Sequence, residues 1–465
     1  MLTGRGVEMA PTAVAAPATR PLNADGIIGG VQASMPALFR CVLRYCAAAV
    51  LATATASQSL AADPLASVER QAMMRFVADS WRDAQRADGF LPYGYDFLAD
   101  RATDDPASAE YIVRQAGAFH AWAKYYALTR DERYRESLRR GIEALAKRSI
   151  PIGKSRTQRW LEATRILSVP AGRLTLRAAL ARSGLLYRRT GPGKLVSADG
   201  QYSGAWAGAT ALALLAELAY SRASGDNRYA DLRSAWLEGL LALRIPGGGF
   251  RELPTSIDDD ADYLNGEAWL ALAVYADLHP NEENVARALA EIDRSLMQRY
   301  VERPNVWFYS WGAMAAAQRW RTTADTRFVD FLKEQAKVFA DRFERELDPD
   351  GNHCDAMEGL AATLGVLVRS GDDRSELAGR LRSLLSRQAV VLPQMQIQRD
   401  QNRMKLGGDA YLASPRLAEF GGAFLLGRYQ PTTRVDAAQH CLSALMMIDR
   451  DGLDREPGTP MPVRR

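Results

Sequence analysis

Acidic, basic and aromatic residues gather in one stretch of the chain, directly after three consecutive glycines. Gly247–Gly249 free the backbone from helical geometry, and Phe-Arg-Glu-Leu-Pro-Thr follows at 250–255. Asp262, Tyr263 and Glu267 come next, before an apolar helical pattern resumes. Carboxyl, guanidinium and phenol groups on a polar loop bind hydroxylated ligands and exchange protons with them. We therefore expect this stretch to carry the chemistry of the molecule.

The elements that position this stretch are helices. Apolar residues recur at helical spacing along most of the chain after residue 68, and alternating β-branched runs are scarce. The connections repeat an Asp-x-Arg-aromatic pattern at Asp131, Asp226 and Asp325, with part of it at Asp372. An Asp in this place caps the incoming helix, and the aromatic residue packs back on the partner helix. The spacing predicts a helical hairpin about every 45 to 50 residues.

A chain of this length at that period holds six or seven hairpins, as an open solenoid or as a closed ring. Large polar insertions at matching places favour the ring, because they then gather at one mouth. We therefore predict an all-α fold, an (α/α)6-type toroid of helix hairpins with long polar loops at one mouth. The predicted domain covers residues 62–465.

The residues before this domain have the character of a targeting segment. A basic region at 35–44 precedes an apolar run at 46–56 that is too short to span a bilayer, and small residues end at Ala61. We predict a signal peptide over 35–61, cleaved after Ala61, with a buried helix at 36–56 as the alternative.

Residues 1–34 fit no targeting segment, and we interpret them as an extension from a start codon assigned too far upstream. The mature chain is then periplasmic or secreted, and it meets the membrane only through the signal peptide before cleavage.

Net charge and cysteine content indicate which partners and which metal sites to expect. The net charge is +4, and it becomes +2 once four Arg and two acidic residues leave with the signal segment, so nucleic acid is not an expected partner. Cys354 and Cys441 remain, and they either pair or stay as two buried thiols. Each follows a His, but adjacent residues seldom bind one metal ion, so we expect neither a metal nor a cofactor.

Residues 252–309 resemble the C-terminal domain of D-glucuronyl C5-epimerases, which invert uronic acid residues within heparan-type polymers. The motifs that carry the resemblance are Glu252-Leu-Pro-Thr255, Leu264-Asn-Gly266, Tyr275-Ala-Asp277-Leu278 and Trp307-Phe-Tyr309. The resemblance implies that Glu252 and Tyr309 are catalytic in epimerase- or lyase-like proton abstraction from uronic acid residues. The family's second catalytic Tyr has no match in this sequence.

Two alternatives stay open. A glycoside hydrolase of the six-hairpin class needs two carboxyl groups about 5.5 Å apart for retention, or about 6.5 to 9.5 Å apart for inversion. The candidate carboxyl groups are Asp96, Glu252, Asp262, Glu267 and Glu358. The other alternative is a non-catalytic glycan-binding subunit, whose partners would include exopolysaccharide assembly proteins.

In each case the expected partner is a polysaccharide or oligosaccharide. The guanidinium group of Arg pairs with carboxylates through two hydrogen bonds. Aromatic rings stack on sugars, although aromatic residues at helical spacing equally fill a core. Glu267 and Glu358 also fit the first turn of a helix, where a carboxylate complements the dipole. The predicted substrate-binding residues are Tyr95, Asp96, Arg114, Arg251, Asp262, Tyr263, Glu267, Trp307 and Glu358.

Overall fold

The chain divides into two compact units, residues 1–61 and 62–465. The computed structural model describes residues 65–157, 159, 186–245, 247–255, 261–346, 350–407 and 409–453. The predicted signal peptide and the predicted upstream extension lie outside these described residues.

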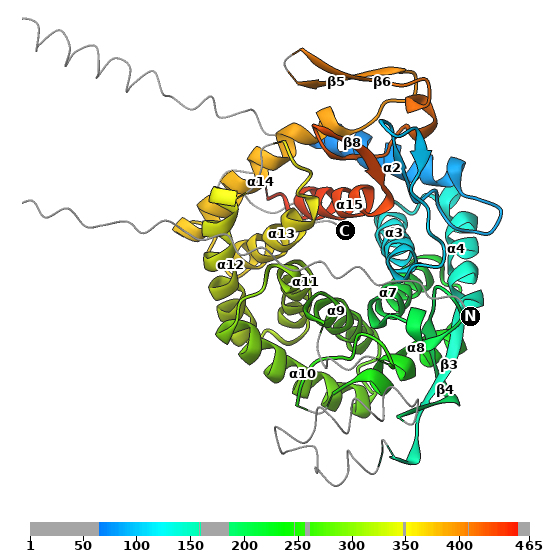
Figure 1. Ribbon diagram of the computed structural model, residues 1–465. Coiled ribbons are helices and arrows are strands. Elements are labelled where there is room, and N and C mark those ends of the chain that lie inside the picture. Colours follow the sequence, from blue (N-terminus) through cyan, green and yellow to red (C-terminus); the bar gives the residue numbers. More distant parts are fainter. Residues whose placement is uncertain are drawn as a thin grey trace, which may run out of the picture. The chain divides into compact units, whose positions relative to one another are not determined.

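In the described part of the chain, six inner helices stand around one axis. They are α3 (Ala109–Thr129), α7 (Ala207–Ser224), α9 (Asp262–Leu278), α11 (Val306–Thr323), α13 (Cys354–Arg369) and α15 (Val435–Asp451). Each packs against the next, and α15 packs against α3, so the inner ring closes (Figure 1). These helices are apolar and buried around most of their circumference, as the many buried residues of α7 and α13 show.

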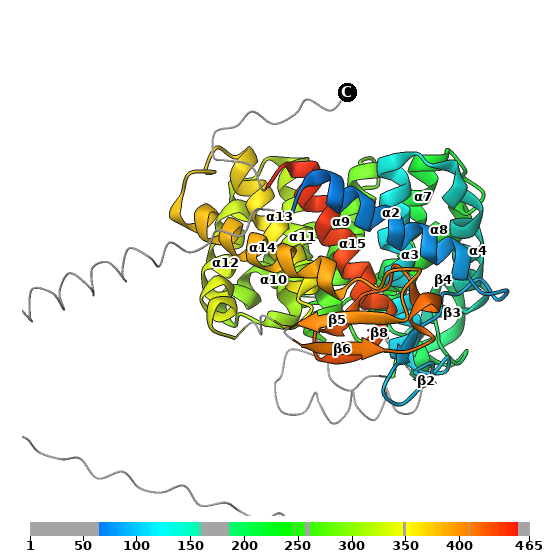
Figure 2. The ribbon, with the colours of Figure 1, turned by 90° about the horizontal axis from the view of Figure 1, so that it is seen from above.

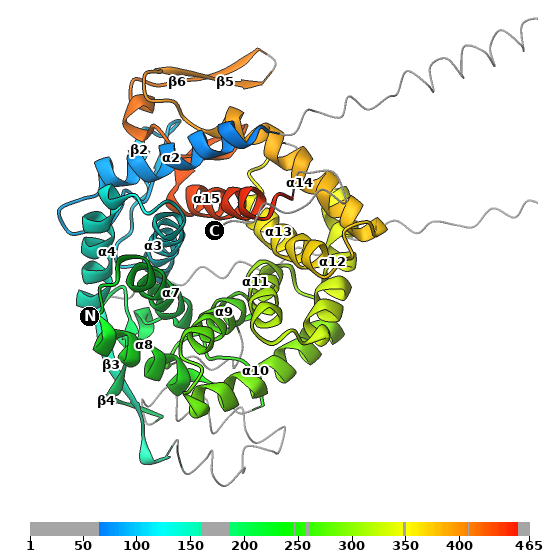
Figure 3. The same ribbon diagram turned by 180° about the vertical axis from the view of Figure 1, so that it is seen from behind.

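Among the described residues, six outer helices surround the inner ring, and each precedes its inner partner in the chain (Figure 3). They are α2 (Ser67–Ala84), α4 (Arg135–Lys147), α8 (Ala230–Leu243), α10 (Glu283–Glu302), α12 (Thr326–Glu346) and α14 (Glu376–Met395). Outer helices such as α10 and α12 bury one face and expose charged residues on the other. The prediction of an all-α toroid of six helix hairpins is confirmed.

The connections that leave the inner helices are short, and three of them share one local structure. The inner helices α3, α7 and α11 end at residues in the left-handed conformation, which are Arg130, Gly225 and Ala324. The Asp that follows accepts a hydrogen bond from the backbone N–H two residues later, at 3.1, 3.1 and 2.9 Å in the three turns. We call the C-terminal ends of the inner helices, with these turns, the short-turn face.

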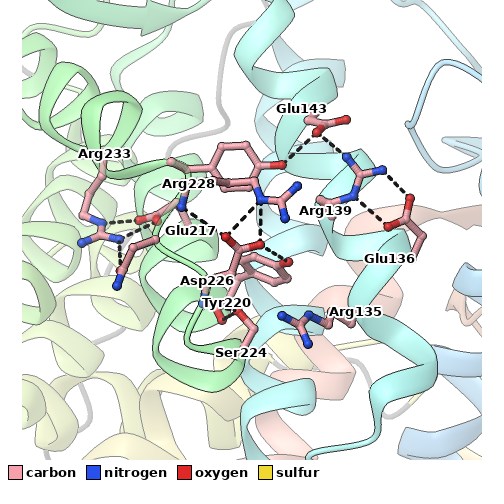
Figure 4. A network of polar contacts seen from close by, with 12 residues as sticks. Arg135, Glu136, Arg139, Glu143, Glu217, Tyr220, Ser224, Asp226, Arg228 and Arg233 are labelled. Atoms are coloured by element: carbon pink, nitrogen blue, oxygen red, sulfur yellow. Dashed lines mark hydrogen bonds and ion pairs between the residues drawn. The ribbon is translucent and has the colours of Figure 1, made fainter.

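Figure 4 shows the turn between α7 and α8. Asp226 forms an ion pair with Arg228 at 2.8 Å and accepts a hydrogen bond from the Tyr220 hydroxyl at 3.2 Å. Tyr229 is buried, and its hydroxyl donates to Glu143 of α4 at 3.0 Å. The Asp therefore organises the turn while the aromatic residue fastens it to a neighbouring helix, as the sequence pattern predicts.

Most connections that enter the inner helices are longer, the exception being 303–305 before α11, and these longer connections hold the described strands. Strands β1 (Gly94–Asp96), β2 (Arg101–Ala102), β7 (Leu425–Gly427) and β8 (Gln430–Arg434) form an antiparallel sheet in the order β2-β1-β8-β7. Two hairpins complete the set, β3 (Ser149–Lys154) with β4 (Tyr187–Val196) and β5 (Arg403–Gly407) with β6 (Ala410–Ala413). Seen edge-on, β2, β5, β6 and β8 lie toward one side of the ring (Figure 2). We call the N-terminal ends of the inner helices, with these connections, the long-loop mouth.

Cys354, the first residue of α13, forms a disulfide with Cys441 of α15. This decides between the two interpretations that the sequence left open, and it ties two adjacent inner helices together near the long-loop mouth. Within the described ranges, every helix is too short or too polar to cross a bilayer.

Candidate functional site

A cavity of about 530 Å³ opens at the long-loop mouth, within the size range of sites that hold small ligands. The inner helices contribute to it through their first two turns. Its polar and aromatic lining residues are Glu110, Arg114, Trp206, Glu252, Asp262, Tyr263, Glu267, Trp307, Trp311, Asn352, Asp355, Arg434, Asp436, Gln439 and His440. Segments from both ends of the described chain thus share one hollow that is rich in carboxyl groups and tryptophan.

Glu267 lies in the second turn of α9 and forms part of the cavity wall. Its side chain is buried, and its Oε2 atom has no hydrogen-bond partner among the described residues. Burial raises the pKa of this carboxyl group to about 8, against the opposing effect of the charge on His440. Gly208 of α7 makes room for the group, because a Cβ atom there would lie 2.0 Å from Oε2. At neutral pH Glu267 therefore carries a proton that it can donate.

His440 of α15 and Glu358 of α13 form a buried pair beside the cavity. The Nδ1 atom of His440 lies 2.6 Å from a carboxylate oxygen of Glu358. Burial alone would lower the pKa of the imidazole, but Glu358, with smaller contributions from Asp355 and Asp436, raises it to about 9. The imidazole of His440 is thus protonated at neutral pH, and it lines the cavity with Glu358 as its buried partner.

Asp436 holds two arginines at the rim of the cavity. Both of its oxygens accept from Arg434, at 2.6 and 2.8 Å, and Arg114 lies 3.1 Å away. Arg114 also donates to Glu110 at 2.7 Å and to the Tyr93 hydroxyl. Burial would raise the pKa of Asp436, but the two arginines more than offset this and lower it. Asp436 is therefore ionised, and both arginines already have a carboxylate partner.

Asn265 of α9 fixes the triple-glycine stretch on the scaffold. Its Oδ1 atom accepts from the Phe250 N–H at 2.7 Å, and a Cβ atom at Gly249 would lie 2.0 Å from that oxygen. The carbonyl of Glu252 accepts from the Ala207 N–H at 2.9 Å, at the start of α7. These bonds place the half-buried Glu252 side chain in the cavity wall.

Asp262 also lines the cavity, but its two oxygens join helices to one another. One accepts from the Tyr300 hydroxyl at 2.7 Å, and the other accepts from the Asn305 amide at 2.6 Å. Asn305 in turn caps α11 by accepting from the Trp307 N–H at 2.8 Å. Asp262 thus orients the start of α11, where the largely exposed Trp307 stands at the edge of the cavity.

No family model and no curated protein matches the sequence. Solved structures share its fold. One is an inactive variant of an alpha-1,6-mannanase from Salegentibacter sp. HEL1_6 in complex with alpha-1,6-mannotetrose, with a TM-score of 0.50, 11% identity, and coverage of 83% of this chain and 99% of that one. Another is a sugar epimerase from a ruminal bacterium, with a TM-score of 0.50, 13% identity, and coverage of 82% and 98%. At these identities the similarity establishes the toroid fold, and the resemblance to the glucuronyl epimerase domain stays a prediction.

The structure brings together most of the residues that the sequence singled out. Glu358 lies directly behind His440. Those that line the cavity are Arg114, Glu252, Asp262, Tyr263, Glu267 and Trp307.

Tyr309 does not lie with them. Its ring packs on Phe339 of α12 with centroids 4.6 Å apart, and its hydroxyl lies 3.4 Å from Thr363 of α13. Burial raises the pKa of the phenol far above its ordinary value. On α11 the residues that face the cavity are Trp307 and Trp311, one turn apart, so Tyr309 points toward the outer helices. The expected pairing of Glu252 with Tyr309 is corrected accordingly.

Tyr95, Asp96 and Arg251 also lie outside the cavity lining. Tyr95 belongs to a separate small hydrophobic cluster, and its hydroxyl donates to Asp100. Asp96 accepts from two backbone N–H groups of the following turn, both at 3.0 Å. Arg251 is buried, and its backbone N–H donates to Leu243. All three are part of the framework around the mouth.

Sequence reasoning missed His440 as a cavity residue, because it considered this residue only as the neighbour of Cys441. A usable signal was present. Asp436 and His440 are four residues apart in the last apolar helical segment, which places both on one helix face. Asp355 was missed as well, since it stands alone at a helix start. Within the described ranges, no cluster of three or more His, Cys, Asp or Glu side chains is arranged to hold a metal ion.

Proposed function

We propose that this chain is a polysaccharide-processing enzyme of the periplasm or the cell exterior, and that it cleaves glycosidic bonds by acid–base catalysis in the cavity at the long-loop mouth. The observation that supports this most is Glu267, a buried carboxyl group that is protonated at neutral pH within a cavity that other carboxyl groups also line. The fold neighbours include a mannanase bound to a mannotetrose and a sugar epimerase, so this ring fold serves enzymes that act on sugars.

The reaction follows from the roles that these groups can take. Glu267 donates its proton to the leaving oxygen, and an ionised carboxylate acts at the anomeric carbon, directly or through a water molecule. Glu252 and Asp355, which stand on other elements of the same cavity, are the candidates for that second group. The positive charge of His440 stabilises the Glu267 carboxylate that remains after proton transfer.

The charge of the cavity favours an uncharged glycan. Besides Glu267, the described part of the lining carries five acidic residues, Glu110, Glu252, Asp262, Asp355 and Asp436, against the three cations Arg114, Arg434 and His440. A uronate polymer would bring further negative charge into this cavity, which costs free energy. The rings of Trp206, Trp307 and Trp311 offer apolar faces on which neutral sugars stack.

The second candidate is proton abstraction at C5 of a uronate, giving epimerisation or elimination. The observation in its favour is His440, a protonated group in the cavity that can neutralise a substrate carboxylate. Glu252 would act as the base. With Tyr309 outside the cavity, the proton for the opposite face would come from Glu267 or Tyr263.

Incubation in deuterated water separates these reactions. The probes are a linear α-1,6-linked mannan and a glucuronate-containing polymer, assayed for reducing ends and for carbon-bound deuterium. New reducing ends without deuterium and without a C4–C5 double bond support hydrolysis. New reducing ends together with that double bond, detected by its ultraviolet absorbance, support elimination. Deuterium at C5 without new ends supports epimerisation. Binding with neither product would overturn both and support the non-catalytic glycan-binding subunit. Glu267→Gln is expected to lower the rate of hydrolysis about 10²- to 10⁴-fold while binding persists.

We also propose that the mature protein is exported to the periplasm or the cell exterior. A disulfide between Cys354 and Cys441 is stable in an oxidising compartment, which agrees with export and with removal of residues 1–61. N-terminal sequencing of the exported protein is expected to begin at Ala62. Recovery of a peptide from residues 1–34 in the mature protein would contradict both the signal peptide and the upstream extension.

A further inference from the structure

A second cavity, of about 560 Å³, opens at the short-turn face. Its inner wall is apolar and includes Leu215, Leu270, Val274 and Met314. Six cations from five of the inner helices and their turns line it as well, namely Lys124, Arg130, Arg222, Arg321, Arg369 and Arg450. Only two lining carboxylates, Asp277 and Asp451, stand among the residues described there. An apolar hollow with a basic lining is the result.

This cavity is distinct from the one at the long-loop mouth. In the part of the chain that the structure describes, the two cavities share no lining residue. The ring of Trp311, which lines the first cavity, lies 6.4 Å from the ring of His120, which lines the second. The side chain of His120 is 6% exposed, and its Nδ1 atom has no partner among the described residues. Burial, with the charge of Lys124, holds the pKa of His120 well below its ordinary value, so the imidazole is neutral. A neutral, buried imidazole is therefore part of the wall of this cavity.

The two carboxylates do not neutralise the cations. Asp451 is shared between Arg369 and Arg450, each at 2.7 Å. Asp277 accepts from Gln318 and Thr322, both at 3.1 Å. Basic residues at helix C-termini complement helix dipoles, which accounts for their sequence positions. It does not account for an apolar-walled cavity between them.

Lys124 is a cation of the cavity lining whose partner is neutral. Its ammonium group donates to Ser443 at 3.2 Å, which is a neutral partner. Burial lowers the pKa of Lys124 to about 8, with further lowering by Arg450 and Arg321 and an opposing effect of Glu358. An anion placed at the rim would relieve this repulsion.

We propose that the cavity at the short-turn face binds an amphipathic anion, with an apolar chain against Leu215 and Met314 and a carboxylate or phosphate head group beside Lys124 and Arg321. The cavity volume falls in the range of small-molecule sites. This site is independent of the glycan chemistry proposed for the long-loop mouth.

Calorimetric titration of the intact protein tests the proposal. The probes are octanoate and octyl phosphate, with 1-octanol as the uncharged chain and inorganic phosphate as the head group alone. We expect one site for the better of the two amphipathic anions, which identifies the head group, and at least about tenfold weaker binding of both partial probes. Equal affinity for octanol and octanoate, or no binding of either anion at millimolar concentration, would overturn the proposal.

Variants locate the site. Lys124→Met and Arg321→Gln are each expected to weaken binding about tenfold, since each removes one charge-assisted contact. The matched control is Arg327→Gln, which removes one positive charge from the same face at an exposed residue that does not line the cavity. Unchanged affinity in Lys124→Met, or an equal loss in the Arg327 control, would refute the site.

Discussion

The two faces of the ring differ in how regular they are. At the short-turn face the same local structure occurs at Asp131, Asp226 and Asp325, each time with a buried aromatic residue three positions later. At the long-loop mouth, by contrast, one connection forms a sheet strand, another is a glycine turn and a third is a helix cap. The similar turns at the short-turn face give the helix hairpins a regular repeat, and this repeat allows the ring to close. The irregular connections are then free to differ, and they bring unlike side chains to one cavity.

This comparison predicts that changes at the turns act on stability, whereas changes at the mouth act on the site. The largest expected effect is at the buried ion pair beside the turn of Figure 4. Glu217 accepts from Arg233 at 2.6 and 2.8 Å, and its side chain is fully buried. Arg233→Met leaves that carboxyl group without its partner and is expected to cost about 3–5 kcal/mol in the free energy of unfolding, measured in urea.

The exposed Arg228 of the same turn is the matched control. Arg228→Gln removes an ion pair whose guanidinium group is solvated, and it is expected to change the free energy of unfolding far less than Arg233→Met does. Similar losses in Arg228→Gln and Arg233→Met would show that the buried pair has no special part in the stability of this face.

The disulfide is the corresponding constraint at the mouth. Replacing Cys354 and Cys441 together by Ser removes a cross-link over 87 residues. We expect a loss of about 2–4 kcal/mol in the free energy of unfolding, because the unfolded chain gains freedom. Unfolding of the wild type with and without a reductant provides the control, and insensitivity to the reductant would contradict the expectation.

Gly208 tests how closely the mouth is packed around Glu267. Gly208→Ala is expected to cost about 1–3 kcal/mol, since its Cβ atom would collide with the carboxyl group of Glu267. Shortening that side chain in the double variant Gly208→Ala with Glu267→Ala should recover part of the loss. Gly379 of α14, where a Cβ atom meets nothing within 4 Å, is the control, and its replacement by Ala should stabilise slightly. A destabilised control would remove the steric explanation.

The smallest expected effect is at Tyr309. Tyr309→Phe removes only a 3.4 Å contact with Thr363 and is expected to cost less than about 1 kcal/mol, with no change in the rate of glycan processing. Glu252→Gln, at the cavity, is expected to lower that rate. A large loss of activity in Tyr309→Phe with normal stability would restore the role that the family resemblance implied.

The sequence predicts the fold well because the repeated turn is local. An Asp that accepts from the N–H two residues later needs no distant partner, so three occurrences are enough to reveal the period. The cavity is predicted in part for the same reason. Glu252, Asp262, Tyr263 and Glu267 lie close together in the chain and reach the same cavity.

Two features of the site could not be predicted from the sequence. One depends on the residue at which a helix begins, and the other depends on closure of the ring. Asn305 caps α11, and that starting point turns Trp307 and Trp311 toward the cavity and Tyr309 away from it. The pairing of His440 with Glu358 joins residues 82 positions apart, and it forms only because α13 and α15 are neighbours in the closed ring. Neither fact follows from the spacing of motifs.

The central claim is that Glu267 is protonated in the folded protein at neutral pH. Its pKa rises from about 4.5 to about 8 on folding, so between these values the unfolded chain has lost a proton that the folded chain keeps. Folding stability from this group is therefore present at low pH and is lost as pH rises toward 8. The decisive measurement is the free energy of unfolding of the wild type minus that of Glu267→Gln, at pH 5 and at pH 8. We predict that this difference falls by about 3 kcal/mol over the interval, whereas a difference that does not change with pH would show that Glu267 is ionised in the cavity and cannot be the acid.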